Sequence, residues 1–418
     1  MAPSRKLFGT DGVRGVAGEQ VTAELALALT RAATARVVAS GRHDGPPRVL
    51  VIRDTRESGE MLEAAVAAGV AAAGGEAMLG GILPTPGAPL LVRRHGFGLA
   101  VVLSASHNPF GDNGIKFFGG DGYKLSDATE AELEAMLDVV PDPVRPGRIR
   151  RFHAALDGYE AALEARFGKL DLTGRRVALD CANGATYEVA PALFRRLGAD
   201  VEVLAAEPDG RNINDGCGST HIDVLAELVR DGGHDAGFAF DGDGDRVLAV
   251  DRHGVVVDGD ELIALAAVHL GVKGVAVTVM TNYGFHTGMK TAGIEVATTP
   301  VGDRYVLEEL RRRGWTLGGE QSGHIIDCDF VPSGDGIAAA LLTLESLEGG
   351  DLADRHAMEK LPQKLVNVRV RDRDAVGSSQ PVQEAVQRES SALEGRGRVL
   401  LRPSGTEPLV RVMVEAPT

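Results

Sequence analysis

The sequence predicts an α/β protein of several domains, and three observations lead to that expectation. At 418 residues the chain is too long for one ordinary hydrophobic core. Short apolar runs typical of buried strands alternate with Ala- and Leu-rich stretches typical of helices as far as about residue 350. After Leu361 and Pro362 the pattern changes to strands around one polar helix. We therefore expect three α/β domains followed by a small α+β domain.

Within these units the expected strands are short and the expected helices are longer. Strands are expected at residues 48–54, 98–104, 176–180, 236–240, 274–280, 315–319, 364–370, 398–402 and 409–415. Helices are expected at residues 58–73, 188–197, 304–313 and about 381–393. Alternation of the two patterns favours layered α/β domains over a helical bundle or a β-sandwich.

Breaks in the pattern predict the domain boundaries. Residues 140–148 (VPDPVRPGR) carry three prolines, and such a stretch ends regular structure between the first two units. A second break lies near residues 254–260, and a third follows Pro362. The expected domains are residues 1–149, 150–254, 255–362 and 363–418.

Charge and composition exclude several kinds of partner. The formal net charge is -15 at pH 7, whereas binding to nucleic acid or to anionic membranes depends on clustered Lys and Arg. No apolar leader follows Met1, and no apolar run approaches the roughly 18 residues of a membrane span. Three widely spaced cysteines, Cys181, Cys217 and Cys328, predict neither a disulfide framework nor a zinc site. We expect a cytoplasmic protein.

Four apolar runs end in polar loops that contain glycine. Open α/β sheets bind their ligands at the carboxyl ends of strands, so these loops are the candidate functional segments. They are residues 103–116 (LSASHNPFGDNGIK), 241–246 (DGDGDR), 318–324 (GGEQSGH) and 402–408 (RPSGTEP).

The loop DGDGDR has the composition of a magnesium site. Asp241, Asp243 and Asp245 alternate with glycines, so their oxygens can surround one hard cation. A calcium EF-hand is excluded because its template needs Gly at the sixth position and Glu at the twelfth, where this chain has Arg246 and Arg252. A polar Asp-Gly turn without a ligand is the competing interpretation. Arg246 would suit an anionic oxygen that faces the metal.

The first loop places Ser104 and Ser106 directly after an expected buried strand. A serine hydrolase is disfavoured because the Gly-x-Ser-x-Gly motif is absent and His107 is the residue next to Ser106. A structural turn rich in Ser, Asn and Pro is an equally good interpretation of this loop by itself.

The remaining two loops carry groups that suit a sugar phosphate. The last loop combines guanidinium groups, hydroxyls and accessible backbone N–H groups, which favour a phosphate. Its candidate residues are Arg402, Ser404, Gly405, Thr406 and Arg411. Glu320 and Ser322 in GGEQSGH can hydrogen-bond to neighbouring sugar hydroxyls. Solvated surface turns remain the alternative for both loops.

Taken together and in this order, the four loops resemble the motifs of the α-D-phosphohexomutase superfamily over essentially the whole chain. SASHNP is similar to the phosphoserine loop of that family, DGDGDR to its metal loop, GGEQSGH to its sugar-recognition loop and RPSGTEP to its phosphate-binding loop. KLFGTDGVRG, DTR, DCANG, CGSTH and VGDRY match further family motifs. The opening LFGTDGVRG, Gln321 and CGSTH resemble the phosphoglucosamine mutase branch more than the phosphomannomutase/phosphoglucomutase branch.

The resemblance implies three α/β domains with mixed sheets and a small α+β domain around a central cleft. The family pattern has one more helix after the last strand, and the fourth domain of this chain is expected to lack it. Ser106 would carry the transferable phosphoryl group. One phosphoserine oxygen would hold Mg²⁺ together with Asp241, Asp243 and Asp245.

Further roles follow from the same resemblance. Glu320 and Ser322 would contact the sugar hydroxyls. The phosphate that is not being transferred would be bound by Arg402, Ser404, Gly405, Thr406 and Arg411. The cleft would be lined by Arg14, Lys116, Arg246 and His324. Lys116 would assist proton transfer.

The implied activity interconverts glucosamine 6-phosphate and glucosamine 1-phosphate through a 1,6-bisphosphate that turns over in the cleft, on the route to UDP-N-acetylglucosamine and peptidoglycan. A hexose 1,6-bisphosphate would act as activator, and the protein would be a monomer or a homodimer without nucleic-acid or membrane partners. The alternatives are a mutase acting on mannose or glucose phosphates, a magnesium-dependent phosphatase, and a non-enzymatic module that binds a cation or a sugar phosphate.

Overall fold

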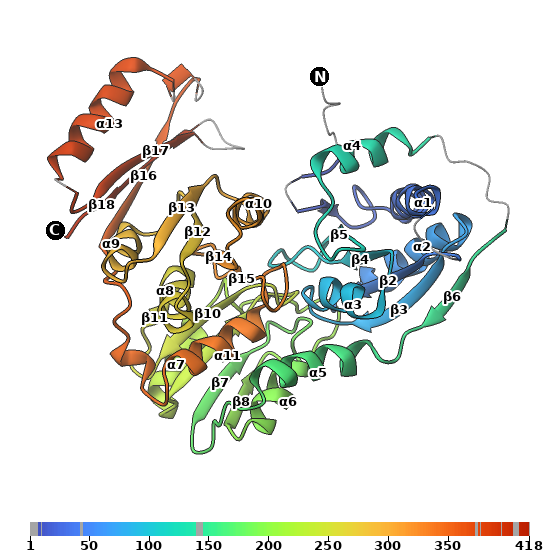
Figure 1. The fold of residues 1–418 in the computed structure, drawn as a ribbon, viewed down its shortest axis with the longest axis horizontal. Helices are drawn as coiled ribbons and strands as arrows, with labels where there is room; N and C mark the ends of the chain where they lie inside the picture. The colour runs from blue at the N-terminus through green and yellow to red at the C-terminus, as the bar shows by residue number, and fades with distance from the viewer. Residues whose placement is uncertain are drawn as a thin grey trace.

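The computed structural model describes residues 7–9, 11–41, 45–138, 145–372, 375–376, 378–393, 395–403 and 409–417. Four sheets of six, five, four and three strands follow one another along the chain. Figure 1 shows them as consecutive bodies, with the last at one end of the molecule. The expected fold class is confirmed. Ser404, Gly405 and Thr406 lie outside the described residues.

The first sheet is mixed and has the strand order β1-β5-β4-β2-β3-β6. Its strands are β1 (Val13–Val16), β2 (Arg48–Arg53), β3 (Glu76–Ile82), β4 (Leu99–Leu103), β5 (Asp112–Gly119) and β6 (Arg148–Arg151). Its helices are α1 (Ala23–Ala39), α2 (Ser58–Ala72), α3 (Gly87–His95), α4 (Asp127–Ala135) and α5 (Ala155–Phe167). The strand β6 crosses the expected boundary at residue 149 and pairs with β3.

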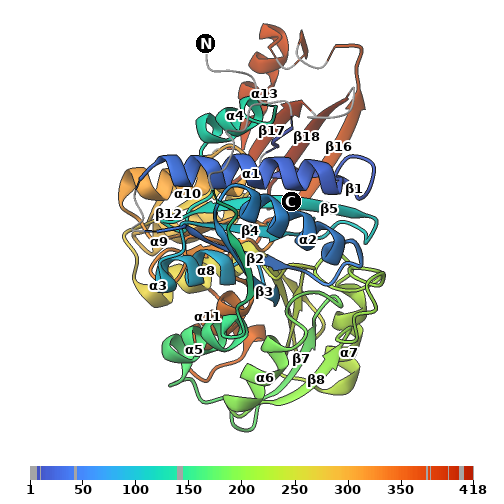
Figure 2. The ribbon, with the colours of Figure 1, turned by 90° about the vertical axis from the view of Figure 1, so that its right-hand side faces the viewer.

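Alternate residues of the central strand β2 enter different hydrophobic cores. Val49 and Val51 pack in the core that contains α1 and α2, whereas Leu50 and Ile52 pack in the core that contains α3 and α5. Successive side chains of a strand point to opposite faces, so a strand covered on both sides is an unbroken apolar run. Figure 2 shows α1 on one side of this sheet and α5 on the other.

One difference from the expected elements concerns the serine loop, a name we use for residues 103–116. Its second half, from Asp112, belongs to β5, which pairs antiparallel with both β1 and β4. The polar sequence DNGIK does not predict a strand because it lacks an apolar pattern. The strand forms because it is hydrogen-bonded to a neighbouring strand on each edge. Lys116 therefore projects from a strand of the sheet.

The second and third domains, which are built on the second and third sheets, repeat the alternation of strands and helices. The second contains β7 (Arg176–Asp180), β8 (Asp200–Leu204), β9 (Ala236–Phe240), β10 (Val247–Asp251), β11 (Val256–Val257), α6 (Val189–Arg196) and α7 (Asp223–Gly232). The third contains β12 (Gly274–Thr278), β13 (Glu295–Thr299), β14 (Leu317–Gly319), β15 (Ile325–Asp327), α8 (Gly259–Leu270), α9 (Tyr283–Thr291), α10 (Asp303–Arg313) and α11 (Gly336–Ser346), followed by the short helix η1 (Leu352–Asp354).

The last domain is a three-stranded antiparallel sheet of order β16-β18-β17 with one helix. Its elements are β16 (Gln363–Arg369), α13 (Gln380–Ala392), β17 (Arg398–Pro403) and β18 (Leu409–Glu415). The largest hydrophobic core runs through the three α/β domains, and among the described residues none beyond Met358 belongs to it. No described helix combines the length and the apolar character needed to cross a bilayer.

Candidate active site

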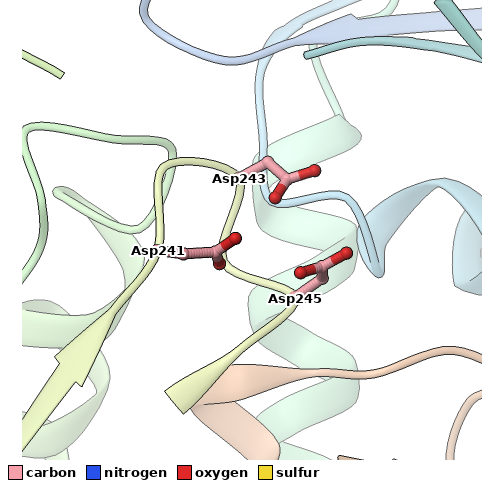
Figure 3. A group of neighbouring side chains, drawn as sticks. All are labelled: Asp241, Asp243 and Asp245. Carbon is pink, nitrogen blue, oxygen red and sulfur yellow. The ribbon is translucent and has the colours of Figure 1, made fainter. Parts of the chain in front are cut away.

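The loop between β9 and β10 gathers three buried carboxylates. Asp241, Asp243 and Asp245 each place an oxygen within 4.8 Å of the others. Figure 3 shows the carboxylate of Asp241 directed toward the other two. Gly244 has φ +70°, a conformation that residues with a side chain rarely adopt, so it allows the tight turn that brings these carboxylates together.

Two oxygens of this cluster have no hydrogen-bond partner. Asp243 Oδ1 and Asp245 Oδ1 are buried and accept no hydrogen bond from any described residue. Burial and the neighbouring carboxylates raise the pKa of Asp241 well above its usual range. A hard divalent cation would coordinate the unpartnered oxygens and offset the crowded negative charge. The cluster therefore fits Mg²⁺.

Ser106 from the serine loop lies against the aspartate cluster. Its Oγ donates to Asp241 Oδ2 and lies 3.3 Å from His107 Nδ1. The residue is buried and has φ +54°, in the left-handed region. A non-glycine residue in that region costs on the order of 1–3 kcal/mol and commonly marks a functional site. The structure thus brings together the two loops that carry the serine and the aspartates.

Lys116 on β5 points into the same cluster. Its Nζ lies 2.7 Å from Asp243 Oδ2, 3.0 Å from Asp11 Oδ2 and 3.7 Å from Asp245 Oδ2. Burial alone would lower the pKa of Lys116, but these three carboxylates raise it above its usual value. The ammonium group is therefore charged in this arrangement.

Two arginines and one histidine surround Ser106. Arg14 donates from Nη1 to the carbonyl oxygen of Ala105 at 3.3 Å, and Arg246 Nη1 lies 3.4 Å from His107 Nδ1. Burial, together with Arg246 and Arg14, lowers the pKa of His107 to about 4, so its ring is neutral. The Nε atoms of both arginines are buried and have no hydrogen-bond partner in the described part of the chain. These N–H groups suit an anion next to Ser106.

His324 connects the aspartate cluster to the third domain. Its Nδ1 lies 3.6 Å from Asp245 Oδ2, and its Nε2 lies 3.6 Å from Asp303 Oδ2. The N–H of Gly334 donates to Nε2 at 3.1 Å, so a neutral ring carries its proton on Nδ1, facing Asp245.

The loop expected to bind the sugar lies beside the metal loop. Gly323 packs so closely on β10 that an added Cβ would lie 2.1 Å from the carbonyl oxygen of Val247. Glu320 is buried and accepts a hydrogen bond from the N–H of Gly302 at 3.0 Å, whereas Ser322 is exposed. Of the two expected sugar ligands, Ser322 is therefore the more accessible.

Arg402 and Arg411 lie in the last domain, on β17 and β18. They occupy directly opposite positions in the antiparallel pair, so they share one face of the sheet. Two guanidinium groups on one face of a sheet can both donate to a single anion. The structure does not place these two arginines in the cluster around Ser106.

Three charged residues of the site have no role in the expectations from sequence. Lys124 forms ion pairs with Asp11 and with Asp303, so it joins the first domain to the third. Asp11 also pairs with Lys116 and Arg14. Asp11 and Asp303 stand in the matched motifs KLFGTDGVRG and VGDRY, and these motifs were the signal that could have identified them.

Comparison with known protein families matches the whole four-domain arrangement. The models for domains I, II, III and IV of phosphoglucomutase/phosphomannomutase match residues 5–140, 157–254, 258–365 and 365–418. A solved phosphoglucomutase/phosphomannomutase family protein from Burkholderia thailandensis superposes with a TM-score of 0.83 at 24% identity, covering 99% of this chain and 93% of the other. The structure of Aspergillus fumigatus N-acetylphosphoglucosamine mutase in complex with GlcNAc-6P and magnesium gives a TM-score of 0.65 at 18% identity, with coverage of 99% and 93%.

The sequence comparison is more specific than the fold comparison. Phosphoglucosamine mutase of Deinococcus deserti is 50% identical over 420 residues, which cover 98% of this chain and 94% of the relative. Phosphoglucosamine mutase of Desulforudis audaxviator is also 50% identical, over 98% of this chain and 94% of the relative. The chain belongs to the phosphoglucosamine mutase family of the α-D-phosphohexomutase superfamily.

Proposed function

We propose that this enzyme interconverts glucosamine 6-phosphate and glucosamine 1-phosphate through a phosphorylated Ser106. The observation that carries the proposal is the position of Ser106 Oγ, which is hydrogen-bonded to Asp241 within the buried aspartate cluster. The family membership supports the substrate, because the name of the 50% identical relative specifies an amino sugar phosphate.

The reaction consists of two phosphoryl transfers. In the first, the bond between phosphorus and Ser106 Oγ breaks, a bond forms between phosphorus and the sugar 1-hydroxyl oxygen, and the hydroxyl proton passes to Ser106 Oγ. The resulting 1,6-bisphosphate turns over in the cleft. In the second, the bond between phosphorus and the sugar 6-oxygen breaks, the phosphoryl group passes to Ser106 Oγ, and the serine hydroxyl proton passes to the 6-oxygen, giving glucosamine 1-phosphate. Such transfers depend mainly on alignment and charge stabilisation, which the residues around Ser106 supply.

The cations near Ser106 have distinct parts in this scheme. The Nε–H groups of Arg14 and Arg246, which donate no hydrogen bond to any described residue, would donate to the phosphoryl oxygens. Lys116 is our proposed proton-transfer residue, since its ammonium group lies in the aspartate cluster, 2.7 Å from Asp243 Oδ2. His324 would orient Asp245 through its Nδ1 proton.

Asp241, Asp243 and Asp245 would hold Mg²⁺ together with an oxygen of the phosphoserine. A phosphate on Ser106 would stand against the Asp241 carboxylate, and this repulsion is the physical reason that a cation is needed there. When bound, the ion supplies charge neutralisation to the phosphoryl group.

Substrate contacts complete the proposal. Glu320 and Ser322 would bind the sugar hydroxyls. The phosphate distant from Ser106 would be bound in the last domain by Arg402, Ser404, Gly405, Thr406 and Arg411. A hexose 1,6-bisphosphate would prime the serine. All three cysteines are free, which supports a location in a reducing compartment such as the cytoplasm.

Intact-mass measurement tests the phosphoserine, and a coupled assay tests the substrate. The purified enzyme, after incubation with glucose 1,6-bisphosphate, should carry one phosphate that is localised to Ser106. It should turn over glucosamine 6-phosphate with a clearly higher kcat/KM than glucose or mannose 6-phosphate. A preference for mannose or glucose would exclude the amino-sugar assignment. Release of inorganic phosphate without isomerisation would show a phosphatase.

A further inference from the structure

Arg56, in the DTR motif, donates all of its side-chain hydrogen bonds to the serine loop and to the carboxylate of Asp54. The side chain is fully buried, and its Nε donates to Asp54 Oδ2 at 2.8 Å. Its other four N–H groups donate to the main-chain carbonyls of Ser106, Asn108, Pro109 and Asp112. A guanidinium has five N–H donors, so none of them remains for a ligand or for solvent.

Asn214 reaches the same loop from the second domain. Its Nδ2 donates to the carbonyl oxygens of Ser106 at 2.9 Å and Asn108 at 3.1 Å. Its own backbone has φ +58°, which asparagine tolerates better than most residues, and its N–H donates to the carbonyl oxygen of Ala182 at 2.9 Å. The amide is thus supported from one domain and bonded to the other.

These contacts hold both main-chain polar groups of Ser106. Its carbonyl accepts from Arg56 and Asn214, and its N–H donates to Ser104 Oγ at 2.9 Å. Ser104 Oγ in turn donates to Asp54 Oδ2 at 2.6 Å. Ser106 has an unfavourable left-handed backbone conformation, which the loop by itself would not keep. The hydrogen bonds from these side chains offset the cost of that conformation.

The metal loop packs directly on this junction. An added Cβ at Gly242 would lie 2.6 Å from the carbonyl oxygen of Ser106 and 2.7 Å from Asn214 Nδ2. Because Gly242 has no side chain, the Asn214 amide has room to donate to the carbonyl oxygen of Ser106. The metal loop, the amide and the serine loop meet at one point.

We propose that Arg56 and Asn214 are positioning residues that hold Ser106 in its left-handed conformation, with Asn214 aligning the serine loop of the first domain to the metal loop of the second. Neither side chain reacts or touches the sugar. The inference rests on the proposed function of Ser106 as phosphoryl carrier. Its consequence is that loss of the Asn214 amide slows phosphoryl transfer and leaves substrate binding intact.

Asn214→Gly provides the test, because glycine removes the amide and adopts φ +58° without strain. We expect kcat for glucosamine 6-phosphate to fall about 10- to 100-fold, the reduction that a small misplacement of reacting groups produces. KM should stay within about twofold of wild type. Phosphorylation of Ser106 by glucose 1,6-bisphosphate, followed by intact mass, should slow in parallel, and hydrogen exchange in residues 104–112 should be faster.

Asn214→Asp repeats the test without loosening the backbone, since it replaces the Nδ2 donor with a carboxylate oxygen that cannot donate to the two carbonyls, and kcat should fall again. The matched control is Asn212→Asp in the same loop, because the Asn212 amide donates only to the carbonyl of Glu207. Its kcat should match wild type. A wild-type kcat in both Asn214 variants, a change confined to KM, or an equal loss in Asn212→Asp would overturn the inference. A wild-type enzyme without phosphate on Ser106 would instead refute the proposed function on which the inference rests.

Discussion

The three α/β domains and the last domain are held in the molecule by different kinds of contact. The first three share one continuous hydrophobic core, with strands β2, β7 and β12 all contributing to it. The last domain is attached through hydrogen bonds of Arg398 and of Glu415, which is fully buried at the end of β18. Glu415 accepts a hydrogen bond from the N–H of Tyr283 at 3.0 Å, and Arg398, which pairs with Glu415 within the last domain, donates from Nη2 to the carbonyl oxygen of Thr281 at 2.6 Å. Figure 1 shows this domain beside α9 and apart from the first two sheets.

This difference matches the division of tasks in the proposed reaction. Transfer between Ser106 and the sugar requires atoms fixed to within a fraction of an ångström, which a shared close-packed core provides. Binding, turning over and releasing a bisphosphate require a part that can move, and attachment through polar contacts outside the shared core permits such motion. Mutations in the packed region should therefore change the chemistry, whereas mutations in the last domain should change binding and closure.

The largest effect is expected for Ser106→Ala, which should abolish mutase activity. The variant lacks the oxygen that carries the phosphoryl group, and Ser104 cannot replace it because its Oγ is occupied with Asp54 and the N–H of Ser106. Thermal stability should be little changed. Ser346→Ala on α11 is the matched control, since Ser346 Oγ only bonds back to its own helix, and it should be fully active. A Ser106→Ala enzyme with most of the wild-type rate would exclude the serine as carrier.

Asp243→Asn should reduce both Mg²⁺ affinity and turnover by orders of magnitude, because a near-octahedral oxygen site depends on its carboxylates. Titration calorimetry measures the affinity, and excess Mg²⁺ should restore part of the activity. Asp231→Asn changes an exposed aspartate of α7 that is paired only with its neighbour Arg230, and should have no effect. Equal Mg²⁺ affinity in the wild type and Asp243→Asn would contradict the ligand role.

Arg402→Ala should lower kcat/KM about 10- to 100-fold in both directions, as expected for loss of a charge-assisted contact of roughly 1.5–3 kcal/mol. Both directions are affected because the bisphosphate turns over and each phosphate in turn occupies the distant site. Phosphorylation of Ser106 should remain measurable. Arg388→Ala, an exposed arginine on α13 in the same domain, is the control. A loss in only one direction would argue against a shared phosphate site.

The smallest effect on catalysis is expected for Glu415→Gln, which tests the attachment of the last domain. Loss of the carboxylate leaves Arg398 without its charged partner and should destabilise the docked domain by about 1–3 kcal/mol. Hydrogen exchange in residues 363–417 should become faster, while Ser106 should still be phosphorylated and kcat/KM should fall only a few-fold. Glu389→Gln on the exposed face of α13 is the control. Unchanged exchange in Glu415→Gln would show that other contacts hold this domain.

The sequence by itself predicted the fold class and pointed to the loops that form the candidate site. The strands Arg176–Asp180, Ala236–Phe240 and Leu409–Glu415 were predicted to the residue. Such strands can be predicted from the sequence because a buried strand is a short apolar run that ends where polar or turn-forming residues begin. The candidate metal site in DGDGDR could also be recognised from the sequence, since three alternating carboxylates within five residues form a local pattern.

The tertiary structure alone decided which distant residues support these loops. Asn214 lies 108 positions from Ser106, and Lys124 lies 179 positions from Asp303, yet both pairs are in hydrogen-bond contact. An isolated asparagine or lysine in a polar stretch carries no periodicity or spacing that predicts its partner. Such contacts form only when the three α/β domains pack together and bring the carboxyl ends of their strands to one place. Packing in the common hydrophobic core fixes the relative positions of these strands, and the local sequence does not.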